Sequence, residues 1–240
     1  MAPVAIVTGG TRGIGAAISG RLRAAGFTVV ASYLNNEQAA AELAASTGAI
    51  VKCWDVADIA ACQDAVAMVE AAIGPVAVLV NNAGITRDAS FRKMTLSQWR
   101  DVLAVNLGGC FNMVHSVWPG MAERRYGRIV NLGSINGQAG QFGQVNYSAA
   151  KAGLHGFTKA CALEGGKAGI TVNLVAPGYT ETDMLAAMPE AALEKTKTAI
   201  PVGRLGLPED IARAVEFFCM KESGFATGGV LSVNGGQHMF

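Results

Sequence analysis

The stretch Val4-Ala5-Ile6-Val7-Thr8-Gly9-Gly10-Thr11-Arg12-Gly13-Ile14-Gly15 decides the fold of this 240-residue chain. Its apolar half, 4–8, predicts a buried strand, and its glycines predict a tight turn into a helix over about 13–25. Glycines let the backbone approach a pyrophosphate, and a helix N-terminus offers it free N–H groups. We therefore expect a dinucleotide here, although tight strand–helix packing also selects glycine. The expected contacts are Gly9, Thr11, Arg12, Gly13, Ile14 and Gly15.

Short β-branched runs alternate with alanine-rich helical stretches along the rest of the chain. Further strands are expected at 28–32, 49–54, 76–80, 128–132, 171–175 and 230–233, and helices at 37–46, 58–73, 95–118, 147–167 and from 208. Seven strands with helical crossovers predict the α/β class. We expect a single-domain Rossmann fold over 1–240, a doubly wound, seven-stranded parallel sheet with helices on both faces. The region 179–202 lacks strand character and is the expected substrate lid.

Composition narrows the classes of function. Hydrophobic residues make up 51% of the chain and charged residues 15%, which favours a large buried core over disorder. The net charge of +1 gives no field that would attract nucleic acid or an anionic membrane. No apolar run approaches the roughly 18 residues of a membrane-spanning helix. We expect no nucleic-acid partner and no membrane association.

The cysteines and histidines indicate the compartment and argue against a metal site. Five cysteines without a Cys-x-x-Cys spacing predict buried free thiols in a reducing compartment. The three histidines show no metal-ligand spacing, so we expect no metal. Strand-like sequence begins at Pro3, which leaves no room for a signal peptide. A cytoplasmic protein is the expectation.

The end of the second strand indicates which dinucleotide binds. NAD-specific sites place an acid there on the ribose 2′-hydroxyl, but this chain has no acid before Glu37. Arg12 offers planar, charged donors for a 2′-phosphate, so NADPH is expected. Leu34 stands where a second basic residue would be decisive, and NADH remains an alternative. Further expected contacts are Ser32, Tyr33 and Asn35, with Asp55 and Val56 at the adenine unless Asp55 is merely a helix N-terminal acid.

Three residues indicate the chemistry. Tyr147 and Lys151 lie four apart, so on a helix they share a face, and Ser134 follows a predicted strand. A cation beside a phenol lowers the pKa of that phenol toward the working range, which suits protonation of a carbonyl oxygen. A serine hydroxyl would hold the same oxygen. The alternative is an amphipathic helix whose tyrosine and lysine merely reach toward solvent.

Together with Asn81-Asn82-Ala83-Gly84 after the fourth strand, these motifs make the whole chain resemble a classical short-chain dehydrogenase/reductase. The resemblance implies that Tyr147 donates the proton, Lys151 assists it and binds the nicotinamide ribose, and Ser134 holds the carbonyl. Asn106 matches the fourth catalytic residue of the family, which helps hold a water. The resemblance implies further cofactor contacts at Asn82, Ala83, Gly84, Tyr147, Lys151, Pro177, Gly178, Thr180 and Thr182.

Several loops are similar to those of the acetoacetyl-CoA reductases of polyhydroxyalkanoate synthesis, within the same family. They are 84–88, 91–95, 136–144, 151–158 and 234–239. The likeness implies NADPH-dependent reduction of acetoacetyl-CoA to (R)-3-hydroxybutyryl-CoA. It implies an acyl pocket of Gln138, Gln141, Phe142, Gln144 and Tyr179, with Asp88 and Lys93 near the coenzyme A arm. The glutamines also fit a polar loop over an open cleft.

Two other functions fit parts of the sequence. A 3-oxoacyl-acyl-carrier-protein reductase performs the same reaction on a carrier that is acidic, and Arg125 suits docking to such a carrier. However, Ala168 stands where those reductases usually carry a second basic residue. A catalytically silent nucleotide-binding regulator would typically lack the tyrosine or the lysine. The resemblance also implies a homotetramer that packs through the helices at 95–118 and 147–167.

Overall fold

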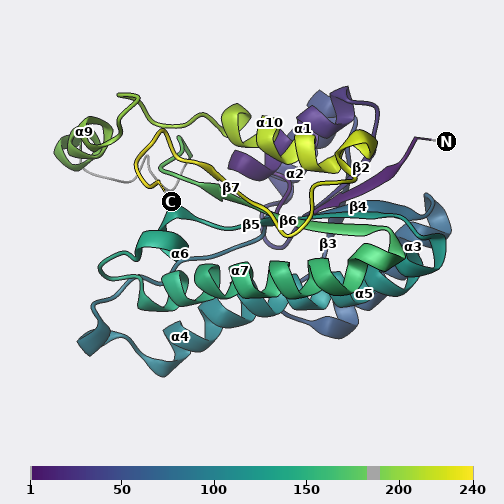
Figure 1. The fold of residues 1–240 in the computed structure, drawn as a ribbon, viewed down its shortest axis with the longest axis horizontal. Helices are drawn as coiled ribbons and strands as arrows, with labels where there is room; N and C mark the ends of the chain where they lie inside the picture. Colours follow the sequence, from purple (N-terminus) through teal and green to yellow (C-terminus); the bar gives the residue numbers. More distant parts are fainter. Residues whose placement is uncertain (1, 183–189, 240) are drawn as a thin grey trace.

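The computed structural model describes residues 2–182 and 190–239, and its centre is one parallel sheet of seven strands (Figure 1). The strands are β1 (Val4–Val7), β2 (Thr28–Tyr33), β3 (Ile50–Cys53), β4 (Val76–Asn81), β5 (Gly127–Leu132), β6 (Ile170–Pro177) and β7 (Val230–Val233). Their order in space is β3-β2-β1-β4-β5-β6-β7. The winding therefore reverses between the neighbouring strands β1 and β4. The predicted α/β fold is confirmed.

Helices cover both faces of the sheet (Figure 1). One layer holds α1 (Gly13–Ala24), α2 (Glu37–Thr47) and α10 (Pro208–Cys219), and the other holds α3 (Ile59–Ala72), α4 (Leu96–Leu103), α5 (Gly109–Arg124) and α7 (Val145–Gly165). The remaining described helices are α6 (Ile135–Ala139) and α9 (Glu190–Ala199), with 3₁₀ turns at Phe91–Lys93, Gly166–Ala168 and Lys221–Ser223. This sandwich is the doubly wound arrangement that the alternating pattern predicts.

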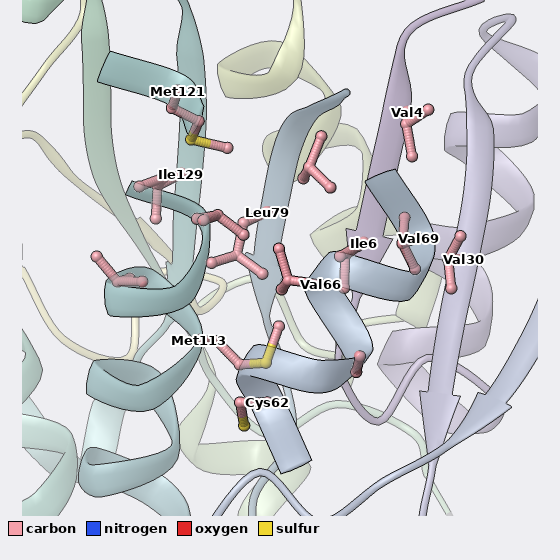
Figure 2. Close-up of a cluster of buried hydrophobic side chains, with 14 of the residues drawn as sticks. Val4, Ile6, Val30, Cys62, Val66, Val69, Leu79, Met113, Met121 and Ile129 are labelled. Atoms are coloured by element: carbon pink, nitrogen blue, oxygen red, sulfur yellow. The ribbon is translucent and has the colours of Figure 1, made fainter. Parts of the chain in front are cut away.

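Alternate residues of each central strand feed two separate cores. Val4 and Ile6 of β1 pack into a cluster with side chains from α3 and α5, which Figure 2 shows around Val66, Leu79 and Met113. Ala5 and Val7 of the same strand point into the opposite cluster under α1 and α10. Because successive side chains of a strand face opposite ways, a strand buried on both faces must be apolar throughout. That requirement explains the continuous apolar runs.

The helix expected at 95–118 is longer and interrupted. A π-helical segment, Ala104–Gly108, joins α4 to α5, and α5 continues to Arg124 past Pro119. Proline removes one backbone hydrogen bond from a helix. Pro119 and His115, whose carbonyl is released, are both exposed, so water can satisfy that oxygen. A proline on the solvent side therefore did not end the helix at residue 118.

The expected lid, 179–202, is partly described. Residues 183–189 lie outside the described residues, and α9 occupies 190–199 beyond them, away from the sheet (Figure 1). The base of the region is anchored, because the N–H of Glu181 donates to the carbonyl of Gly206 and that of Gly206 to Tyr179. A closing motion of this region stays a prediction.

The cysteines differ in burial. All five are free, and Cys62, Cys110 and Cys219 are buried, but Cys53 at the end of β3 is exposed. The expectation of buried thiols is therefore wrong for Cys53, which lies on an edge strand that is covered less completely. Among the described helices, none has the length and apolar character needed to span a membrane.

Candidate active site

The site begins where the winding reverses, at the adjacent carboxyl ends of β1 and β4. The hydroxyl of Thr8 accepts hydrogen bonds from the N–H groups of Asn82 and Ala83, both at 3.0 Å. In return, Nδ2 of Asn82 donates to the carbonyls of Thr8 and Gly9, at 3.0 and 2.9 Å. Ligands of open α/β sheets bind in the crevice at this kind of position. Two predicted motifs thus meet at the expected edge.

The glycine turn leaves the N-terminus of α1 open. Arg12 is the N-cap residue, but its side chain makes no capping hydrogen bond, and the first turn carries no acid. A Cβ on Gly15 would lie 2.1 Å from the carbonyl oxygen of Gly9, so any larger residue would disrupt the turn. The free N–H groups and the positive end of the helix dipole suit a pyrophosphate. The residues present therefore fit a dinucleotide.

The residues at the end of β2 that were predicted to contact the cofactor differ in burial. Ser32 is 1% exposed, and its hydroxyl accepts a hydrogen bond from the N–H of Gly9 at 3.1 Å. Ser32 therefore holds the backbone of the glycine turn, whereas the sequence had predicted that it contacts the cofactor. Tyr33 is half-buried, and Asn35 and Arg12 are exposed. Within the described chain, the Arg12 guanidinium has no ion-pair partner, and it is available to an anion.

The expected adenine residues follow β3. An oxygen of Asp55 accepts from the N–H of Ala57 at 2.8 Å, which closes a local turn. The carbonyl of Val56 accepts from Nδ2 of Asn112 in α5 at 2.9 Å, while the Val56 side chain is buried. Asp55 thus shapes the loop before α3, and it is not the helix N-terminal acid of the alternative, because Asp58 caps that helix. The second oxygen of its carboxylate is left for a ligand.

Tyr147 and Lys151 share the first turns of α7. The Lys151 ammonium lies 5.7 Å from the centre of the Tyr147 ring and donates to the carbonyl of Leu132 at 2.7 Å. Lys151 is 4% exposed, whereas Tyr147 is half-buried. The end of β5 thus fixes a buried cation beside a phenol that solvent can reach. This geometry supports the reactive pair over the alternative of two solvent-seeking side chains.

Asn106 links Lys151 to the loop after β4. It lies in the π-helical segment, is fully buried, and exchanges two hydrogen bonds with the backbone of Ile85, at 2.8 and 3.1 Å. A Cβ on Gly84 would lie 2.4 Å from Oδ1 of Asn106 and 3.8 Å from the Lys151 nitrogen. Asn106, Gly84 and Lys151 therefore converge. The widened turn is typical of a functional position in a helix.

Ser134 lies just after β5, at the start of the short helix α6. It is the N-cap of that helix, and its hydroxyl accepts from the N–H of Asn136 at 3.1 Å. A Cβ on Gly137 would lie 2.7 Å from the backbone carbon of Lys151, so glycine allows α6 to lie directly on α7. Sequence patterns missed α6, because five residues are too few to show helical periodicity. This packing places α6, which Ser134 begins, against the turn of α7 that carries Lys151.

The segment after β6 approaches the glycine turn. A Cβ on Gly13 would lie 3.4 Å from Cγ2 of Thr182, which places Thr182 beside the open end of α1. Thr180 is 4% exposed, and its hydroxyl donates to the carbonyl of Gly178 at 3.1 Å. Pro177 is the last residue of β6. Of the two threonines, only Thr180 has its hydroxyl bonded within the described part of the chain, so Thr182 is the better candidate for a phosphate contact.

The expected substrate residues do not form a closed pocket in the described chain. Phe142 is 89% exposed, Gln141 and Lys93 are exposed, and Tyr179 is half-buried. Gln138 donates to the hydroxyl of Ser232 in β7 at 2.9 Å. Gln144 and Asp88 bind each other, Nε2 to Oδ2, at 2.9 Å. This arrangement agrees with the alternative of a polar loop over an open cleft.

Burial disfavours ionisation of the Cys110 thiol, which lies near the site. Desolvation raises the pKa of Cys110 to about 11, against a smaller, opposing effect of the Lys151 cation. The Cys110 sulfur lies 3.4 Å from the carbonyl of Asn106. At neutral pH this group is a thiol and not a thiolate, and the thiolate is the nucleophilic form. Nucleophilic catalysis by Cys110 is therefore disfavoured.

Two hollows described on the chain, of about 450 and 440 Å³, lie elsewhere. One lies between α1 and α10, and the other beside the amino ends of β5 and β6. Neither is lined by a residue of the site described above. No cluster of three metal-ligating side chains occurs among residues 2–182 and 190–239. The site is therefore identified by its converging polar groups and not by the size of a cavity.

Sequence reasoning missed Asn146, the residue before Tyr147. It is fully buried, and its amide nitrogen donates to the carbonyls of Arg87 and Gln98, at 3.0 and 3.1 Å. Its oxygen accepts from the N–H of Tyr147 at 2.8 Å. Asn146 therefore ties the start of α7 to α4 and to the loop after β4. The sequence offered only the position of this asparagine directly before Tyr147, and its burial is visible in the structure alone.

Comparison with known proteins gives a family and full-length relatives. The family model described as enoyl-(acyl carrier protein) reductase matches residues 9–238. An acetoacetyl-CoA reductase from Shinella zoogloeoides is 58% identical over 238 residues, and one from Rhizobium meliloti (strain 1021) is 56% identical over 239, each covering 99% of both chains. A 3-oxoacyl-(acyl-carrier-protein) reductase from Aquifex aeolicus (strain VF5) is 43% identical over 241 residues, or 98% of this chain and 96% of the relative. The likeness therefore spans nearly the entire chain.

Proposed function

Because the chain belongs to the short-chain dehydrogenase/reductase family, we propose that it is an acetoacetyl-CoA reductase that forms (R)-3-hydroxybutyryl-CoA. The observation that carries this proposal is the full-length likeness to relatives with that name, at 56–58% identity. Ser134, Tyr147 and Lys151 provide groups that suit the reaction, with Lys151 held beside the Tyr147 ring. The product fits polyhydroxyalkanoate synthesis.

The roles of the chain's own residues follow from their positions. A nicotinamide dinucleotide, when bound, would supply the hydride for the new C–H bond at the ketone carbon. Tyr147 donates its phenolic proton to the ketone oxygen, which forms the new O–H bond. Lys151, held by the Leu132 carbonyl, stabilises the phenolate that remains. The hydroxyl of Ser134 donates a hydrogen bond to the same oxygen and orients the ketone, and Asn106 holds the loop beside Lys151.

The family uses a nicotinamide dinucleotide, and we propose NADPH as the preferred form. The exposed guanidinium of Arg12 at the start of α1 supports this preference. The sequence after β2 reaches Glu37 before it offers a carboxylate, so the usual partner of an NAD ribose is missing there. The open N-terminus of α1 receives the pyrophosphate, with Thr182 beside it. NADH is the weaker cofactor on this account.

We expect the acyl group of the substrate to be carried by coenzyme A and not by a carrier protein. Arg125, the residue suited to an acidic carrier, is exposed and donates to the carbonyl of Lys167 at 3.0 Å, but Ala168 adds no second charge beside it. The test compares kcat/KM for acetoacetyl-CoA and for acetoacetyl carrier protein, each with NADPH and NADH. We expect acetoacetyl-CoA to be preferred by at least about tenfold, or about 1.4 kcal/mol. Preference for the carrier substrate would identify a 3-oxoacyl-carrier reductase instead.

A homotetramer and a cytoplasmic location complete the proposal. Phe111 of α5 is 51% exposed and Leu163 of α7 is 85% exposed, and apolar side chains so exposed suit a subunit interface on these helices. Light scattering should give four times the chain mass, and a monomer would contradict the proposed assembly. Five free cysteines fit a reducing compartment.

A further inference from the structure

A chain of three hydrogen bonds runs from the loop after β4 to Ser134. Oδ2 of Asp88 accepts from Nε2 of Gln144 at 2.9 Å, and Oε1 of Gln144 accepts from Nδ2 of Asn136 at 2.9 Å. The backbone N–H of Asn136 then donates to Oγ of Ser134 at 3.1 Å. Asp88 follows β4, Gln144 precedes α7, and Asn136 lies in α6. Three separate segments are thereby joined at the serine.

The carboxylate at the outer end sets the direction of the chain. An ionised carboxylate accepts hydrogen bonds and donates none, so Asp88 requires the amide nitrogen of Gln144 to face it. The amide oxygen of Gln144 must then face Asn136, which presents its own nitrogen. With an uncharged amide at position 88, both directions would satisfy the same bonds. Asp88 therefore selects one of two otherwise equivalent arrangements.

At Ser134 the hydroxyl proton stays free, because the backbone N–H of Asn136 can only donate, whichever way the side-chain amides point. The serine oxygen already accepts a hydrogen bond from the N–H of Asn136, and its own proton has no acceptor among the described residues. A ketone oxygen needs a donor, and the hydroxyl can supply one in this state. The position of the serine depends on Asn136. The side chain of Asn136 is in turn bonded to Gln144, which is bonded to Asp88. The chain thus presents Ser134 as a donor.

Neighbouring bonds keep the three segments in register. The N–H of Ala89 donates to the carbonyl of Gly143 at 2.9 Å, and Asn146 donates to the carbonyl of Arg87 at 3.0 Å. These contacts flank the Asp88–Gln144 bond on both sides. The loops therefore cannot shift freely to replace that bond if it is lost. A defect at Asp88 or Gln144 should be transmitted to α6.

We propose that Asp88, Gln144 and Asn136 are positioning residues that fix Ser134 as a hydrogen-bond donor to the ketone. This role differs from direct contact of Asp88 and Gln144 with the substrate, which the family resemblance implies. The inference rests on the proposed reduction of a 3-oxoacyl group. It predicts that the position of Ser134 depends on an unbroken chain of hydrogen bonds from residue 88 to Asn136, and that the carboxylate can lie at either position 88 or position 144 of that chain.

Moving the carboxylate along the chain tests the inference. Gln144→Glu places a second carboxylate against Asp88, and like charges repel, so kcat should fall by at least about tenfold. Adding Asp88→Asn restores the bonds, because the amide nitrogen introduced at position 88 donates to the carboxylate introduced at position 144, and that carboxylate still accepts from Asn136. We expect the double variant to regain kcat within about threefold of wild type. Asp88→Asn alone keeps a hydrogen bond to Gln144 but no longer fixes which way the Gln144 amide points. Its kcat should fall only a few-fold.

The readouts separate positioning from other effects. The Kd for NADPH should stay unchanged in all variants, and Gln63→Glu, which adds the same charge on the exposed side of α3, should keep the wild-type kcat. Failure of the double variant to recover, or a Gln144→Glu enzyme as fast as wild type, would overturn the inference. Each rate is measured with acetoacetyl-CoA and with ethyl acetoacetate, which has the ketone but no coenzyme A. If the wild-type enzyme reduces only the ester, the proposed substrate is contradicted. The role of the hydrogen-bond chain is then still tested on the ester, where recovery of kcat in the double variant supports it and lack of recovery overturns it.

Discussion

At the scale of single residues, the partner of a side chain decides whether it serves the fold or a ligand. Ser32 and Arg12 were both expected to contact the cofactor. The hydroxyl of Ser32 is buried and supports Gly9, whereas the guanidinium of Arg12 is exposed at the open end of α1. The same distinction separates Thr180, bonded to Gly178, from Thr182, which lies beside Gly13. Free polar groups at this edge are therefore the best candidates for contact.

Arg12→Ala should discriminate between the two dinucleotides. The loss of a charged hydrogen bond costs about 1.5–3 kcal/mol, so the Kd for NADPH should rise by about 10-fold or more. The Kd for NADH should change little, because NADH lacks the 2′-phosphate. Fluorescence titration measures both constants, with Arg100→Ala on the exposed side of α4 as the control. Equal losses for the two dinucleotides would remove Arg12 from this role.

At the scale of elements, α10 shows how one carboxylate can organise a helix start. Asp210 accepts hydrogen bonds from Arg204 at 2.8 Å, from the N–H of Leu207 at 2.9 Å and from Arg213 at 2.5 Å. These donors, the Arg204 guanidinium first, lower the pKa of Asp210 to about 2. An acid at this end also matches the helix dipole. The charged form of Asp210 therefore stabilises the folded protein.

Replacing Asp210 with asparagine should give a loss of stability that depends on pH. Because the folded pKa is depressed, the contribution is present above the ordinary value near 3.8 and is lost as pH falls toward about 2. At pH 7 the unfolding temperature of Asp210→Asn should fall by roughly 2 °C, and the difference from wild type should shrink between about pH 4 and about pH 2. Calorimetry across this range measures it.

Glu209→Gln is the matched control for that experiment. Glu209 is the neighbouring acid in the first turn of α10, and it forms no ion pair within the described chain. Its replacement should shift the unfolding temperature less than that of Asp210 at pH 7. A difference between Asp210→Asn and wild type that persists unchanged at low pH would show that the charge is not the source of the stabilisation.

At the scale of the whole molecule, the parallel sheet gathers residues that are far apart in the chain. The ends of β1, β4, β5 and β6 bring together the glycine turn, the Asn82 loop, Ser134 and the segment through Thr182. This convergence could be predicted, because the carboxyl ends of parallel strands meet at one edge. The seven strands were also predicted within two residues at each end, since buried apolar runs are a strong local signal.

The rest of the site depends on contacts that no local pattern contains. The Asp88–Gln144–Asn136 chain joins loops whose relative placement is set by α6 lying on α7, and that contact rests on Gly137. The π-helical segment at Asn106 reflects its bonds to Ile85 and not a helical propensity. Burial of Ser32 follows from packing of the turn above it. Such details need the assembled tertiary structure.

The central claim is that Tyr147 protonates a ketone beside a bound dinucleotide. Tyr147→Phe keeps the ring that packs near Lys151 and removes the proton. The rate of NADPH oxidation with acetoacetyl-CoA, measured with the Kd for NADPH on the same preparations, tests this claim most directly. The account predicts that kcat falls by about 10²–10⁴-fold while the Kd for NADPH stays within about twofold. A Tyr147→Phe enzyme that turns over at the wild-type rate would contradict it.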